Sequence, residues 1–142
     1  MGRLARLWSL SRREKWLFFE ASVLLLLSIT FVRAIAFKHI DKFLRARWND
    51  GAQSDNQPEQ EIKVLRHSVL RAVNALPCKS LCLSRSIVEF VMLRRRGIPA
   101  VIKVGARFAS PSCLEAHAWI DIGPSSVNSE FTTVRRIGAP ND

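Results

Sequence analysis

The hydrophobic pattern changes its period at the tripeptide Gly97-Ile98-Pro99, and this change constrains the fold more than any other feature. Before it, a segment that opens at residues 80–82 carries apolar side chains at helical spacing, and the glycine suits a C-terminal cap. After it, residues 100–108 (AVIKVGARF) alternate and are rich in β-branched side chains, as in a strand. A helix followed directly by strands predicts an α+β domain.

Two further strands are expected downstream. Residues 116–122 (AHAWIDI) alternate, which places His117, Trp119 and Asp121 on one face of a strand. The turn sequence GPSS then leads to a third strand over residues 127–134 (VNSEFTTV). The order helix, strand, strand, strand predicts a small antiparallel sheet beside the helix.

Upstream, residues 4–47 are expected to form one long helix or two shorter ones. Ser11 and Glu14 have the spacing of a capping box, which would start a helix at that point. Polar residues at 48–60 indicate a linker, and residues 61–76 have helical periodicity up to Pro77. The composition therefore divides the chain into an N-terminal helical region with its linker, residues 1–58, and a core, residues 59–142.

The apolar run Ala21 to Val32 covers roughly half of the ~20 residues needed to span a bilayer, and charged residues bracket it. No cleavage site of the signal-peptide type follows. We favour a buried core helix. The alternatives are membrane contact through residues 17–37 and a cleaved signal peptide. Three cysteines cannot all pair, so at least one thiol is free and a cytoplasmic, reducing compartment is expected.

The formal charge of +10 predicts an anionic partner, such as nucleic acid, a lipid surface, or an acidic peptide or protein. The chain contains no recognition helix, RNA-binding signature or Gly-rich phosphate loop. Nucleic acid is therefore not expected as a partner. The run Arg94 to Arg96 ends the helix, where cations complement the helix dipole without any ligand.

Cys82 is the candidate nucleophile. In the first helical turn, unpaired backbone N–H groups and the helix dipole favour a thiolate, and Arg85 acts in the same direction. His117 on a later strand is placed to reach a sulfur atom at the start of a helix, as papain-like hydrolysis requires. Trp119 is expected to pack beside this site.

A third group should orient the imidazole. Asp121 is four strand residues from His117, or about 13 Å, which is too far. If the chain reverses at GPSS, Thr132 would lie opposite His117 and Glu130 diagonally on the same face. Glu130 is therefore ranked first and Asn128 second, and Asp121 is expected to make a hydrogen bond near the hairpin end or to face solvent.

Two other interpretations remain open. Cys78 with Cys82, and Cys113 with His117, are each four residues apart and supply four zinc-ligand types, although the gaps are looser than in common zinc hairpins. The chain could then be a zinc-stabilised basic binding module. It could also be a catalytically silent module that docks a precursor or a partner protein.

The stretch CLSRSIVEFVMLRRRGIPAVIKVGAR, followed by AHAWIDI, resembles the transglutaminase-like cysteine peptidases of lasso-peptide biosynthesis, the B-type proteins. Their pattern is a Cys-Leu-x-Arg-Ser opening, an Arg-rich helix end before Gly-Ile-Pro, and a His-Ala-Trp strand followed by an acidic residue. The matching positions are Cys82, Arg85, Ser86, Arg94 to Arg96, Gly97 to Pro99, Gly105, His117, Ala118, Trp119 and Asp121. The basic, Leu-rich N-terminal helices also resemble those of the family.

The resemblance implies a transglutaminase-like (papain-like) fold and removal of the leader from a lasso precursor peptide. Cys82 would attack the peptide carbonyl and His117 would transfer the proton, with Arg85, Trp119 and Asp121 in supporting positions and no cofactor. A separate ATP-dependent cyclase would close the macrolactam. A separate protein would recognise the leader, because the chain is too short to hold that domain and so resembles the stand-alone peptidase of the split type.

The chain departs from the family at the third catalytic position. The family has an aspartate after a Val-Asn or Ile-Asn pair, whereas here Ser129 stands at that position and Glu130 follows it. A difference of one residue in the hairpin would let Glu130 substitute. Otherwise Asn128 supplies the orienting group or the group is missing.

Overall fold

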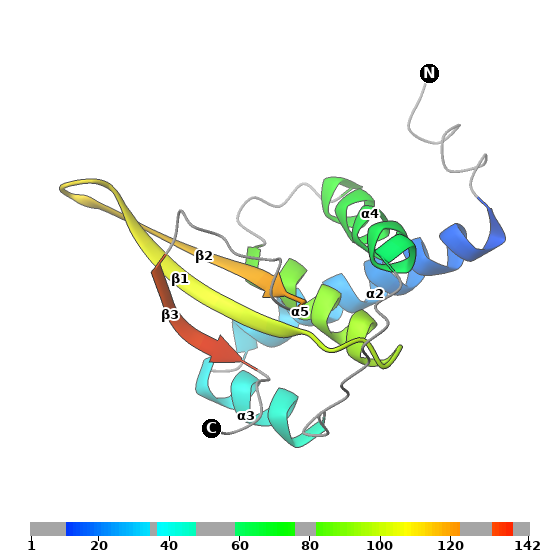
Figure 1. Ribbon diagram of the computed structural model, residues 1–142, viewed down its shortest axis with the longest axis horizontal. Coiled ribbons are helices and arrows are strands. Elements are labelled where there is room, and N and C mark those ends of the chain that lie inside the picture. The colour runs from blue at the N-terminus through cyan, green and yellow to red at the C-terminus, as the bar shows by residue number, and fades with distance from the viewer. Residues whose placement is uncertain (1–10, 35–36, 48–58, 76–81, 123–131, 138–142) are drawn as a thin grey trace.

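The computed structural model describes residues 11–34, 37–47, 59–75, 82–122 and 132–137 (Figure 1). These residues form four helices and a three-stranded antiparallel sheet, so the predicted α+β class is confirmed. The helices are α2 (Arg12–Ala34), α3 (Phe37–Arg47), α4 (Glu59–Ala75) and α5 (Cys82–Arg94). The strands are β1 (Val101–Ser110), β2 (Cys113–Asp121) and β3 (Thr132–Ile137).

The capping box at the start of α2 is confirmed. The Ser11 backbone N–H donates to Glu14 Oε2 at 3.0 Å, and the Glu14 backbone N–H donates to Ser11 Oγ at 3.3 Å. These bonds satisfy donors that the first helical turn cannot pair internally. The hydrogen bond from the Ser11 backbone, followed by that from its hydroxyl and by the charge of Arg71, lowers the pKa of Glu14 below its ordinary value.

The C-terminal cap of α5 is also confirmed. Gly97 has a φ of 73°, in the left-handed region that glycine adopts without a steric penalty. The Ile98 N–H donates to the Leu93 carbonyl at 3.1 Å, and the Gly97 N–H donates to the Arg94 carbonyl at 3.1 Å. This pair of bonds is a Schellman motif, which ends the helix and turns the chain toward β1.

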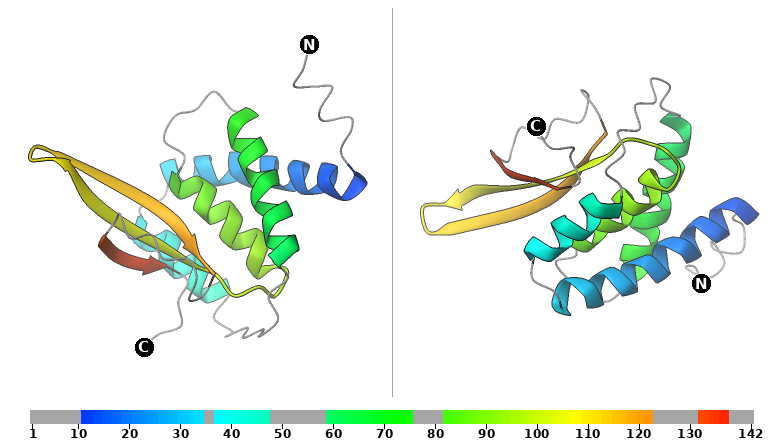
Figure 2. Two further views of the ribbon diagram at one scale, coloured as in Figure 1. Left: turned by 45° about the horizontal axis from the view of Figure 1, so that its top comes forward. Right: turned by 90° about the horizontal axis from the view of Figure 1, so that it is seen from below.

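One hydrophobic core joins α2, α4, α5 and the sheet. Figure 2 shows these three helices close together, with the sheet beside them. α2 contributes Leu17, Ala21 and Leu25 to this core, so the expectation of a buried core helix is confirmed for one face of the helix only. The other large side chains of the core include Leu65, Val69, Phe90, Leu93, Ile102, Ile120 and Ile137.

The outer face of α2 is largely exposed and apolar. The helix has 23 residues and is long and apolar enough to cross a membrane by length and composition alone, and only 22% of its most apolar window is buried. The uninterrupted apolar run, Ala21 to Val32, is shorter than this helix because Glu20 and Arg33 bracket it, and both charged residues lie within the helix.

The sheet order is β2-β1-β3, with β1 antiparallel to both neighbours. The expectation that Thr132 lies opposite His117 on an adjacent strand is therefore wrong. β3 pairs with the other edge of β1, where Ile137 lies opposite Ile102 and both side chains are fully buried. Burial of this pair gives a physical reason for the arrangement, because apolar surface removed from water stabilises the pairing.

The β1–β2 hairpin is longer than the alternating pattern predicted. Ladder pairing continues to Phe108 opposite Leu114 and, after an irregularity, to Ser110 opposite Cys113, although these residues are exposed. Backbone pairing thus extends beyond the part of the hairpin that covers the core. The hairpin tip projects away from the helices in Figure 1.

Candidate active site

A pocket of about 460 Å³ lies between α4, α5 and β2. It contains both predicted catalytic side chains, Cys82 from α5 and His117 from β2. The other lining residues are Arg66 and Val73 from α4, Arg85, Ser86 and Glu89 from α5, and Ala118, Trp119 and Ile120 from β2.

Cys82 is the first residue of α5, where the structure places it in the first turn as the sequence predicts. Its side chain is half-buried and carries a free thiol. The first backbone N–H groups of a helix have no partner within the helix, and they carry the positive end of the dipole. An oxyanion that forms beside Cys82 would be stabilised at such a position.

His117 is held by the sheet. It lies opposite Gly105 in the β1–β2 register, and its ring stacks on Trp119 with ring centroids 6.2 Å apart and an interplanar angle of 15°. A Cβ added to Gly105 would lie 2.8 Å from the Trp119 ring and 2.6 Å from the Thr132 carbonyl oxygen. The absent side chain of Gly105 therefore leaves the space into which Trp119 packs beside His117.

Glu89 and Arg66 are site residues that sequence reasoning missed. Glu89 is only 4% exposed, and its carboxylate accepts a hydrogen bond from Arg85 Nε at 3.0 Å. Arg66 Nε lies 3.8 Å from the other carboxylate oxygen. The spacing of Cys82, Ser86 and Glu89 at four and three residues places them along one helix face, a signal that could have found Glu89.

Asp121 lies four residues from His117 on the same strand, β2. It pairs with Lys103 across the β1–β2 ladder, where it lies opposite Val101 at the end of the hairpin remote from the turn. Glu130 and Asn128 lie outside the described residues. The third strand does not pair beside His117, as the ranking of Glu130 required, because β1 separates β3 from the strand that carries His117.

Zinc ligation by Cys113 and His117 together conflicts with the strand geometry. Both residues belong to β2, and four strand residues span about 13 Å, whereas one zinc ion needs ligand atoms within about 2.3 Å. Cys113 is exposed near the hairpin tip. Cys78 lies outside the described residues, and within those residues no group of three or more His, Cys, Asp or Glu side chains is close enough to hold a metal ion.

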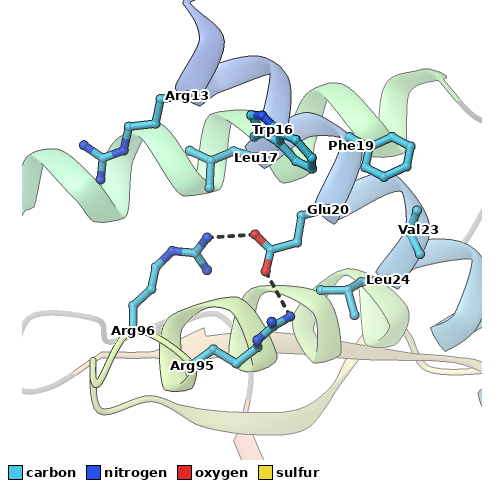
Figure 3. Close-up of a pocket in the computed structure, with 9 residues that line it drawn as sticks. All are labelled: Arg13, Trp16, Leu17, Phe19, Glu20, Val23, Leu24, Arg95 and Arg96. Atoms are coloured by element: carbon cyan, nitrogen blue, oxygen red, sulfur yellow. Dashed lines mark hydrogen bonds and ion pairs between the residues drawn. The ribbon is translucent and has the colours of Figure 1, made fainter.

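A larger pocket, of about 630 Å³, lies along α2 and contains neither Cys82 nor His117 (Figure 3). Glu20 is held there between two arginines, with Arg96 Nη2 at 2.7 Å and Arg95 Nη1 at 3.2 Å. Arg96 Nη1 also donates to the Met92 carbonyl at 2.7 Å. The arginine run thus caps the end of α5, as predicted, and ties it to α2.

Comparison with known proteins gives one match. A family model for the transglutaminase-like superfamily, Transglut_core3, matches residues 24–137 of the chain. Neither the curated proteins nor the solved structures contain a match.

Proposed function

Because the chain belongs to the transglutaminase-like superfamily, which includes cysteine peptidases, we propose that it is a cysteine peptidase that removes the leader from a ribosomally made lasso precursor peptide. The observation that carries the proposal is the shared pocket of Cys82, at the start of α5, and His117 on β2. The resemblance of the Cys82 and His117 motifs to the lasso peptidases supports the choice of substrate.

In the proposed reaction the Cys82 thiolate attacks the carbonyl carbon at the end of the leader. Backbone N–H groups at the start of α5 stabilise the oxyanion of the tetrahedral intermediate. As the C–N bond breaks, the His117 imidazolium protonates the amine of the core peptide, which leaves. Water, deprotonated by His117, then hydrolyses the thioester and releases the leader acid and the thiolate.

The proposed reaction has partners outside this chain. A separate recognition protein binds the leader and delivers it, and a separate ATP-dependent cyclase uses the freed amine to form the macrolactam. These partners follow from the family resemblance, and the cytoplasmic location follows from the odd number of cysteines. The positive formal charge of the chain supports a peptide or protein partner of opposite sign.

The test is cleavage of the precursor with the recognition protein present, followed by mass spectrometry. We expect Cys82→Ala to abolish leader release, because no other described thiol lies in the pocket. We expect His117→Ala to lower the rate by about 10²- to 10⁴-fold, the usual contribution of a general base.

Matched controls are Cys113→Ala, at an exposed thiol near the hairpin tip, and His39→Ala, at an exposed position of α3. Both should cut as the wild type does. Cleavage by Cys82→Ala at the wild-type rate would remove the nucleophile assignment. A folded wild type that binds the precursor but leaves it intact would instead favour the silent docking module.

A further inference from the structure

The pocket that holds Cys82 also holds an unusual charge cluster. Two guanidinium groups, of Arg66 on α4 and Arg85 on α5, converge on the single buried carboxylate of Glu89. Arginine is always protonated, so the cluster carries a net charge of one positive unit when Glu89 is ionised. Its positive charge is not matched within the cluster.

The geometry leaves hydrogen-bond donors unused. Both arginines face Glu89 through Nε, and within the described part of the chain neither pairs with a second acidic residue. The side chains of Arg66 and Arg85 are 41% and 43% exposed, whereas that of Glu89 is nearly closed to solvent. Terminal guanidinium nitrogens in this setting suit a carboxylate, which they bind with paired, charge-assisted hydrogen bonds.

We propose that Arg66 and Arg85 form a subsite for a carboxylate group beside Cys82. Glu89 is a positioning residue, since its buried carboxylate holds both guanidinium groups without neutralising both of their charges. Combined with the proposed peptidase function, on which this step rests, the subsite favours precursors with a carboxylate close to the scissile bond. The subsite itself requires only that Cys82 and the two arginines share a pocket.

The first test needs no precursor. Iodoacetate and iodoacetamide both alkylate a thiolate, which forms an S–C bond and displaces iodide, but only iodoacetate carries a carboxylate. The ratio of the two rates at Cys82 therefore reports anion binding, because the reactivity of the thiolate is common to both reactions. Peptide mapping by mass spectrometry gives the same ratio at exposed Cys113 in the same molecule, as an internal control for overall charge.

We expect the ratio of iodoacetate to iodoacetamide rates at Cys82 to exceed that at Cys113 by about three- to tenfold, the range of an ordinary hydrogen bond, because both arginines are partly exposed to water. Arg66→Gln should bring the Cys82 ratio down toward that of Cys113, while Arg66→Lys should keep part of the preference. Equal ratios at the two thiols in the wild type, or a Cys82 ratio unchanged by Arg66→Gln, would overturn the proposal.

Competition distinguishes the two sources of a carboxylate. N-acetylaspartate α-amide offers only a side-chain carboxylate, N-acetylalanine only a terminal one, and N-acetylalanine amide neither. If one of the two acids slows alkylation of Cys82 by iodoacetate more than N-acetylalanine amide does, that acid identifies the source of the carboxylate. If neither acid does so, the result counts against the subsite. If the precursor is cleaved but Cys82 shows no preference for iodoacetate, the carboxylate subsite alone is contradicted. If Cys82 prefers iodoacetate but the precursor is not cleaved, the peptidase function alone is contradicted.

A second inference rests on α2, independently of the pocket. Its outer face is defined by the exposed side chains Trp16, Phe19, Val23, Leu26 and Leu27. At 100° per residue these lie within an arc of about 100°, opposite the buried Leu17, Ala21 and Leu25. A continuous exposed apolar stripe of this kind marks an interaction surface.

The charges around the outer face of α2 are positive. Both acidic residues of the helix are engaged within the chain, Glu14 with Ser11 and Arg71, and Glu20 with the two arginines that end α5. Basic residues stand near both ends, with Arg12 in the first turn and Arg33 in the last. The face therefore combines apolar area with a cationic border.

We infer that the outer face of α2 binds an anionic lipid surface, with the helix lying parallel to it. The helix is about 34 Å long at 1.5 Å per residue, and its inner face belongs to the core, so it can lie on a bilayer without leaving the domain. Long basic side chains at its ends extend toward headgroups, and Trp16 suits the polar boundary.

Co-sedimentation with vesicles tests this inference. The full chain should bind vesicles of phosphatidylcholine mixed with phosphatidylglycerol, and bind pure phosphatidylcholine at least tenfold more weakly, because Lys and Arg near anionic lipid each add attraction. Trp16→Ser combined with Phe19→Ser should lower binding to the mixed vesicles by about tenfold or more.

Phe108→Ser is the matched control, since Phe108 is 75% exposed, as Trp16 is 73% exposed, but lies on the hairpin. It should bind as the wild type does. Equal binding by wild type and the α2 double variant would overturn the inference. The inference would also be overturned if the wild type forms a dimer in solution and the same double variant is a monomer, because a second copy would then cover the outer face.

Discussion

At the residue scale, the position of His117 depends on a residue with no side chain. Gly105 leaves the space that the Trp119 ring occupies, and that ring stacks on His117. The glycine was visible in the sequence only as one matching position of a family pattern. Its role follows from the sheet register, which places it directly opposite the histidine.

We predict that Gly105→Ala destabilises the fold and lowers activity together. A Cβ there would lie 2.8 Å from Trp119 and 2.6 Å from the Thr132 carbonyl oxygen, so ring and strand must move. Overpacking of this kind costs about 1–3 kcal/mol, and the displaced tryptophan shifts His117. Urea unfolding gives the free energy of unfolding, and the kcat/KM for precursor cleavage gives the loss of activity.

The double variant Gly105→Ala with Trp119→Phe is the informative control. Phenylalanine lacks the outer ring atoms that the new Cβ meets, so the two changes should couple and part of the stability should return. Additive losses in the double-mutant cycle, or an alanine variant as stable and active as wild type, would contradict this account of Gly105.

The two principal site residues could be predicted because each has a local signal. A cysteine at a helix start and a histidine on an alternating strand are readable from a few neighbours. Arg66 could not be found in this way, because it belongs to α4 and reaches the pocket only through helix packing. Glu89 had a local signal in its spacing from Cys82, but a carboxylate on an apolar helix gives no indication of which arginines it will meet.

At the element scale, helix ends and the first hairpin were predictable for the same reason. The capping box at Ser11 and the glycine cap at Gly97 are decided by interactions within six residues. The β1–β2 hairpin joins strands adjacent in the sequence, across a turn at Pro111 and Ser112. Local chemistry determines such features, and the structure agrees with each of them.

The sheet order was not predictable in this way. The alternating pattern of β3 is equally compatible with pairing to β2 or to β1, because each strand of the β1–β2 hairpin has one unpaired edge that a third strand can join. Burial of Ile137 against Ile102 favours β1, and this depends on where the helices leave room. Consequently Thr133 and His117 flank Gly105 from opposite sides, two strand spacings or about 10 Å apart.

This distance bears on the third catalytic group. Thr133 in β3 is too far from His117 for a direct side-chain hydrogen bond, so an orienting group for the imidazole would come from outside β3. Glu130 and Asn128 remain predictions from the sequence. The stacked Trp119 already restrains the ring plane of His117, which is one of the tasks that an orienting carboxylate performs elsewhere.

At the scale of the whole molecule, the core crosses the compositional boundary at residue 58. Leu17, Leu25, Ile40 and Leu44 come from before it and pack in the same cluster as Leu65, Phe90 and Ile102 from after it. The matched family region, residues 24–137, also extends across it. Composition reports local polarity, and a polar linker is compatible with either one core or two.

We predict that the fragment 59–142 does not fold on its own. The fragment lacks α2 and α3, so it exposes the faces of α4 and α5 that pack against Leu17, Ala21 and Leu25 in the full chain. Emptying a buried leucine or isoleucine site costs about 2–5 kcal/mol, so losing Leu17, Leu25, Ile40 and Leu44 together costs about 8–20 kcal/mol, as much as the 5–15 kcal/mol that stabilises a typical domain. Circular dichroism should show no cooperative thermal transition for the fragment, although the full chain melts cooperatively.

Complementation makes this test specific to a shared core. If the two parts form one core, adding residues 1–58 as a separate chain should restore a cooperative transition, with a midpoint that rises with concentration because two chains now associate. The variant Leu25→Asp in the added chain should fail, since Leu25 is fully buried, whereas Phe19→Asp on the exposed outer face should succeed. A fragment 59–142 that melts cooperatively alone would instead show that the candidate active site belongs to an independent domain. In that case α2 would not be needed for folding, and only its outer face would have a role.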